Sequence, residues 1–93
     1  MKIIKRNGTE TDFEKSKIEN AIKGANKEVE GNKKLSEEEI KEIASYIEDK
    51  AVTATHNFNV EEIQDMVEDE INKRGKFELG RKYSQYRFKR SNQ

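Results

Sequence analysis

The apolar residues of this 93-residue chain change their spacing near Glu14, and this change limits the folds open to the chain. Before Glu14, two short stretches that favour strands flank the pair Asn7-Gly8. Asn-Gly is the strongest short hairpin signal, because both residues tolerate the positive φ of a type I′ turn. We therefore predict a β-hairpin over residues 2–13. Two strands alone are marginally stable in water, so this hairpin must lie on other elements.

Beyond Glu14 the apolar residues recur at the spacing i, i+3, i+4, i+7, which is typical of one face of a helix. Ser36 and Glu39 form the pattern of a capping box at the start of the second such stretch. Around Phe58, apolar and polar residues alternate, which allows a short third strand or an extended connector. The predicted helices span residues 14–28, 36–52, 60–74 and 77–90.

Each predicted helix has one apolar face, so the most economical packing is a small four-helix bundle with the sheet lying over one end. This is an α+β, mostly α fold, with a β-hairpin or a three-stranded sheet as its β part. A length of 93 residues suits one compact domain, so we predict a single domain over residues 1–93.

The composition excludes several classes of function. The chain has no cysteine, which excludes disulfides, thiol catalysis and thiolate metal sites. Its 19 basic and 19 acidic residues cancel, so any anion site must be a local cluster. There is no apolar run of about 18 residues and no signal-peptide core, so we expect a cytoplasmic protein.

We also predict no catalytic residue and no metal ligand, and therefore no enzyme within this chain. The sequence has neither a Walker-type loop nor G-x-G-x-x-G. The single histidine, His56, cannot form a metal site alone. The acids at 37–39 and 61–62 fall in first helical turns, where they complement the helix dipole.

A local cluster of cations does suggest a ligand. Lys5 and Arg6 end the first predicted strand, and Lys17 lies in the first turn of the first predicted helix, where free backbone N–H groups favour anions. A phosphate chain is bound by this combination of a guanidinium, ammonium groups and amide donors. On these residues alone, we favour the alternative in which Lys5 and Arg6 are solvated charges that discourage sheet-to-sheet pairing.

Three blocks, in order and spread over nearly the full length, carry a family resemblance. The first is Ile3-Ile4-Lys5-Arg6-Asn7-Gly8, followed by Phe13 and Lys17-Ile18. The second is Val60-Glu61-Glu62-Ile63-Gln64-Asp65-Met66-Val67-Glu68, and the third is Leu79-Gly80-Arg81-Lys82-Tyr83-Ser84-Gln85-Tyr86-Arg87. Together they resemble the ATP-cone family. The third block is most similar to the cones of anaerobic, glycyl-radical ribonucleoside-triphosphate reductases.

The resemblance implies a regulatory domain that holds ATP or dATP between a β-lid and four helices. Its implied role is allosteric: it switches the activity or oligomeric state of a ribonucleotide reductase. The implied partners are adenine nucleotides and a reductase catalytic domain, in cis or in trans; membranes and nucleic acids are not expected. The sequence leaves open whether Mg²⁺ accompanies the nucleotide, whether ATP or dATP is preferred, how many nucleotides bind, and whether the chain forms a homo-oligomer or belongs to a longer reductase.

The resemblance also implies site residues. The triphosphate positions are Lys5, Arg6, Lys17, Val60, Gln64 and Lys89. The adenine-pocket positions are Ile3, Phe13, Glu14, Ile18 and Ile22. Thr11-Asp12 stands where the family commonly has Glu-Pro, so adenine selectivity is less supported than triphosphate binding. Glu10 is an alternative for this contact, although it should face away from the side of Thr11, because neighbouring strand residues face opposite sides.

Two alternatives remain open. The chain could be a nucleic-acid or protein interaction module, such as a cone-type transcriptional regulator, that uses the basic last helix with Tyr83 and Tyr86. The helical spacing of these tyrosines favours a core role instead, and the absence of cysteine before the first block weakens the case for a regulator with a zinc ribbon. The other alternative is a purely structural helical domain with solvated charged faces.

Overall fold

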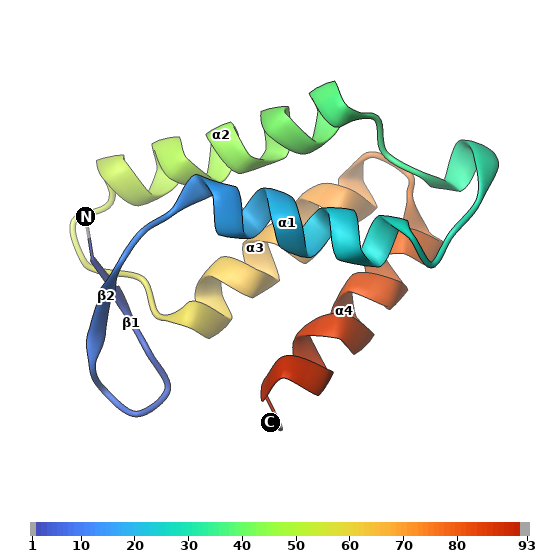
Figure 1. Ribbon diagram of the computed structural model, residues 1–93. Coiled ribbons are helices and arrows are strands. Elements are labelled where there is room, and N and C mark those ends of the chain that lie inside the picture. Colours follow the sequence, from blue (N-terminus) through green and yellow to red (C-terminus); the bar gives the residue numbers. More distant parts are fainter. Residues whose placement is uncertain (1, 92–93) are drawn as a thin grey trace.

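A computed structural model describes residues 2–91, with side chains described for residues 2–87. It contains two short strands, four α-helices and one short 3-10 helix (Figure 1). The elements are β1 (Lys2–Ile4), β2 (Glu10–Asp12), α1 (Lys15–Asn26), η1 (Gly31–Lys33), α2 (Glu37–Thr53), α3 (Val60–Lys73) and α4 (Phe77–Ser91). The prediction of a mostly helical α+β fold is confirmed. Within residues 2–91, no helix is both long and apolar enough to cross a membrane.

The hairpin forms, but its turn differs from the predicted type I′ turn. Gly8 has a φ of +87°, whereas no described residue other than glycine has a positive φ, so Asn7 does not adopt the conformation that a type I′ turn requires. The Lys5 carbonyl accepts from the Gly8 N–H at 2.9 Å, and the Thr9 carbonyl accepts from the Lys5 N–H at 2.7 Å. These bonds close a three-residue loop with one left-handed glycine. The Asn7 side chain instead accepts from the Thr9 N–H at 3.1 Å.

This turn sets the strand register and therefore the faces of the sheet. β1 and β2 are antiparallel, and Ile3 lies opposite Thr11. A two-residue turn over Asn7-Gly8 would instead place Ile3 opposite Asp12, and a shift of one residue exchanges the two faces of a strand. In the observed register Ile3 is buried and Thr11 half-buried, while Glu10 and Asp12 are exposed.

The third strand that the sequence allowed as one alternative is reduced to a single bridge, so the sheet described has two strands. The Ile4 N–H donates to the Phe58 carbonyl at 3.0 Å, and Ile4 forms a parallel bridge with Asn59. The pairing stops there because Asn59 is already the N-cap of α3. Its side chain accepts from the Glu62 N–H at 2.8 Å, and the Glu62 carboxylate accepts from the Asn59 N–H at 3.1 Å. This capping box starts a helix where a strand would have continued.

The four helices close around one apolar core. α1 packs against α2 and α4, and α3 packs against the same two helices. Figure 1 shows α3 and α4 running obliquely to α1 and α2, so the helices surround the core without forming the four-helix bundle that we predicted. The largest fully buried side chains all lie on the helices: Ile22, Ile40, Ile43, Ile47, Val67, Ile71 and Leu79.

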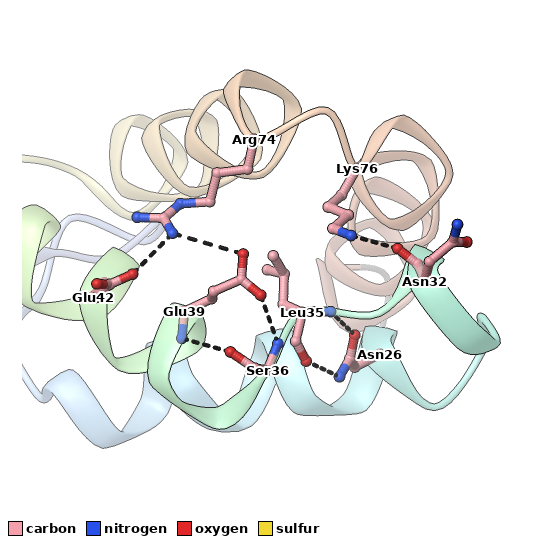
Figure 2. A network of polar contacts seen from close by, with 8 residues as sticks. All are labelled: Asn26, Asn32, Leu35, Ser36, Glu39, Glu42, Arg74 and Lys76. Carbon is pink, nitrogen blue, oxygen red and sulfur yellow. Dashed lines mark hydrogen bonds and ion pairs between the residues drawn. The ribbon is translucent and has the colours of Figure 1, made fainter.

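A polar network fastens the end of the molecule away from the hairpin (Figures 1 and 2). The Asn26 side chain bonds to the backbone of Leu35, which holds the α1–α2 connection against the end of α1. Across the α3–α4 turn, the Lys76 ammonium donates to the Asn32 carbonyl, and Arg74 pairs with Glu42 at 3.0 Å. The α1–α2 and α3–α4 connections are therefore tied to neighbouring elements, and the hairpin occupies the opposite end.

The predicted capping box of α2 is confirmed. Ser36 accepts from the Glu39 N–H at 3.2 Å, and the Glu39 carboxylate accepts from the Ser36 N–H at 3.0 Å. The bond from the Ser36 N–H lowers the pKa of the Glu39 carboxyl. Both α2 and α3 thus begin with reciprocal side-chain caps.

Candidate functional site

The tip of the hairpin carries two exposed cations, Lys5 and Arg6. The Arg6 guanidinium lies 2.8 Å from the carboxylate of Glu61, which belongs to the first turn of α3. Both side chains of this pair are more than half exposed, at 63% and 59%. The sequence separates the two residues by 55 positions, so the ion pair is a long-range link between the hairpin tip and α3.

The start of α1 differs from the starts of α2 and α3. Its N-cap residue, Glu14, has an extended backbone, and its side chain makes no capping hydrogen bond within the described part of the chain. The first turn of α1 contains no acid; it carries Lys15 and Lys17 instead. Lys17 is exposed and lies 3.3 Å from the Glu14 carboxylate. Backbone N–H groups at a helix start, together with two ammonium groups, favour a bound anion.

The structure does not gather the predicted phosphate-binding cations into one cluster. Lys5 and Arg6 lie at the tip, whereas Lys17 follows the other end of β2 (Figure 1). The stretch from Thr9 to Glu14, if fully extended, spans up to about 17 Å. A ligand that contacts both groups must therefore be elongated, or the hairpin tip must move toward α1.

The predicted adenine-pocket residues do come together, but mostly as core. Ile3, Ile18 and Ile22 belong to the same buried cluster, and Phe13 packs against it half-buried. Ile22 has no exposed surface, so a bound base cannot touch it unless neighbouring side chains repack. Glu14 is exposed beside this cluster, at the start of α1.

The ATP cone domain family matches residues 1–92. The chain belongs to the ATP-cone family. ATP-cone domains are nucleotide-binding regulatory domains that bind ATP or dATP as effectors. A search of curated proteins found no match to the chain.

The remaining predicted phosphate positions of the cone lie on α3 and α4. Val60 is half-buried against the core at the first position of α3, and Gln64 is half-buried in the following turn. Lys89 belongs to α4, but its side chain lies outside the described residues. Val60 follows the loop that bridges to β1, so the start of α3 lies beside the hairpin (Figure 1).

Three acids of α3 that pair with arginines of the hairpin and of α4 were not predicted from the sequence. Glu61 pairs with Arg6, while Asp65 and Glu68 lie 2.7 and 3.5 Å from the Arg87 guanidinium of α4. The three acids are spaced i, i+4, i+7, which places them on one face of α3. This spacing is the signal in the sequence that places the three acids together, whereas the position of Glu61 in a first helical turn predicts only that it complements the helix dipole.

The tyrosines of α4 belong to the packing of the cone. Tyr83 is 3% exposed, and burial raises the pKa of its phenol. Tyr86 is half-buried, with its ring against the backbone of α1 at Gly24, where an added Cβ would lie 3.1 Å from the ring. Neither residue forms the exposed aromatic surface that the nucleic-acid alternative requires. Among the described residues, no group of three or more acids or histidines is placed to hold a metal ion.

Proposed function

We propose that this cone binds ATP or dATP as the allosteric effector of a ribonucleotide reductase, and that it catalyses no reaction itself. The third sequence block favours an anaerobic, glycyl-radical ribonucleoside-triphosphate reductase as the parent enzyme. The main structural support for nucleotide binding at this site is the way α1 begins. Its start has two lysines and no side-chain cap in the described structure, whereas α2 and α3 start with complete capping boxes.

In this proposal the phosphates bind at the start of α1 beside Lys17, and Lys5 and Arg6 approach them from the hairpin tip. Val60 and Gln64 of α3 lie beside the phosphates and sugar, and Lys89 adds a further cation. Phosphate oxygens suit these donors, because guanidinium and ammonium groups both form charge-assisted hydrogen bonds with them.

The base would lie against the apolar cluster at the foot of the hairpin. Ile3, Phe13 and Ile18 supply the wall, and Ile22 supports that wall from within the core. Glu14 would hydrogen-bond the base edge, and its exposure directly after Phe13 supports this role. Adenine selectivity then depends on a single acid, since Thr11 replaces the strand residue that the family commonly uses.

Regulation requires the attached or associated reductase to have two states that differ in affinity for the effector. ATP and dATP can bias the enzyme only through this difference. The catalytic partner would be a reductase domain in cis or in trans, and the switch would act on its activity or oligomeric state.

Calorimetric titration of the chain with ATP, dATP and GTP, with and without Mg²⁺, tests the proposal. We expect both adenine nucleotides to bind more tightly than GTP. The substitution Lys17→Ala should weaken ATP binding about tenfold or more, as expected for the loss of a charge-assisted hydrogen bond. Lys41→Ala is the matched control, because Lys41 is an exposed lysine on α2 and is not among the proposed phosphate contacts. Absence of ATP and dATP binding at millimolar concentration would refute the proposal.

A further inference from the structure

Arg6 is held by an anion of the same chain, whereas the proposed function needs its guanidinium to hold a phosphate. Its guanidinium lies 2.8 Å from the Glu61 carboxylate. Carboxylate and phosphate oxygens accept from the same fork of guanidinium N–H groups. A phosphate that approaches this fork also meets the negative charge of Glu61, and like charges at short range repel.

Capping of α3 does not account for the placement of Glu61. The neighbouring Glu62 forms the capping box with Asn59. Glu61 has no part in that box, and its side chain extends to the hairpin tip instead. Arg6 and Lys17 lie toward opposite ends of β2, so the hairpin tip must move toward α1 if a compact ligand is to contact both. The pair between Arg6 and Glu61 holds the tip at α3 and opposes this movement.

We propose that Glu61 competes internally with the nucleotide for Arg6 and thereby sets the affinity of the cone for its triphosphate effector. Binding exchanges the Glu61 carboxylate for a phosphate, and the same exchange releases the hairpin tip from α3. The inference rests on the proposed function, since it concerns the same phosphate site.

The central test is ATP affinity of the Glu61→Gln variant, measured by calorimetry. An exposed ion pair stabilises by less than about 1 kcal/mol, so its loss should tighten ATP binding about two- to fivefold. Glu62→Gln is the matched control: it removes the same charge one residue away, and glutamine can keep the cap on Asn59. Its ATP affinity should stay close to that of the wild type. In an Arg6→Gln background, Glu61→Gln should no longer tighten binding.

Hydrogen exchange provides a second measurement if Arg6→Gln binds ATP too weakly to titrate. Without nucleotide, the amides of Lys5 and Gly8, which close the tip, should exchange faster in Glu61→Gln than in Glu62→Gln. Equal ATP affinities of the two glutamine variants, or equal exchange at the tip, would overturn the competition while leaving ATP binding intact. Failure of the wild-type chain to bind ATP would instead overturn the proposed function, and the competition with it.

Discussion

Replacement of Asn26 by alanine should destabilise the fold without touching the proposed site. The Asn26 carboxamide accepts from the Leu35 N–H and donates to the Leu35 carbonyl, both at 2.9 Å (Figure 2). Leu35 itself is 3% exposed, so these bonds also fix a core side chain. Each lost hydrogen bond costs about 1 kcal/mol, so we expect a loss of about 2 kcal/mol. For a domain of this size, that corresponds to a fall in Tm of roughly 8–16 °C.

Thermal and urea denaturation followed by circular dichroism would measure the effect. Asn32→Ala is the matched control: it makes the same chemical change in the same connection, and Asn32 holds Lys76 through its backbone carbonyl, which the variant keeps. We expect the control to stay within about 0.5 kcal/mol of the wild type. Equal losses in the two variants would refute the assignment of this stability to the Asn26 side chain. ATP affinity should be the same in both, because the network lies at the end away from the hairpin (Figure 1).

Three further predictions concern the core, the α2 cap and the hairpin turn. Ile43 has no exposed surface, so Ile43→Ala should cost about 2–5 kcal/mol in urea unfolding, and a cost below about 1 kcal/mol would contradict its place in the core. The pKa of Glu39 lies below its ordinary value of 4.5, so its carboxylate stabilises the fold above that pH, and the contribution is lost as the pH falls through the lower folded pKa. The stability difference between wild type and Glu39→Gln should therefore be present at neutral pH and disappear in acid; a difference that does not change with pH would count against this account. Gly8 has a φ of +87° with no atom within 4 Å of an added Cβ, so Gly8→Ala should cost about 1–2 kcal/mol in thermal unfolding from backbone strain alone, and an unchanged Tm would argue against the left-handed turn.

The helices could be predicted because their signals are local. The apolar stripes mark the faces that the structure buries, and Ser36 with Glu39 marks the start of α2. Such signals are carried by residues within one or two turns of each other, so little long-range information is needed to recognise them. The family assignment was equally available, because its three blocks lie in order along the chain.

The site could be predicted only as a set of residues. The contacts of Lys5, Arg6 and Lys17 with a phosphate remain predictions. The structure places Lys5 and Arg6 before β2, at the hairpin tip, and Lys17 beyond the other end of β2. Ile22 shows a second limit. Its spacing on α1 is the same whether it lines a pocket or fills the core, and its full burial follows from how the other helices pack.

The sequence by itself determined the helices, their caps and the family, because each depends on residues close together or on blocks in order. Only the tertiary structure decided the hairpin register, the two-stranded sheet and the pair between Arg6 and Glu61. The register depends on which turn lets Ile3 face the core. A third strand does not extend past the bridge at Asn59, because Asn59 is the N-cap of α3. The ion pair joins residues 55 positions apart, so no local pattern encodes it; it forms because the loop before α3 bonds to β1 and brings the hairpin beside the start of α3.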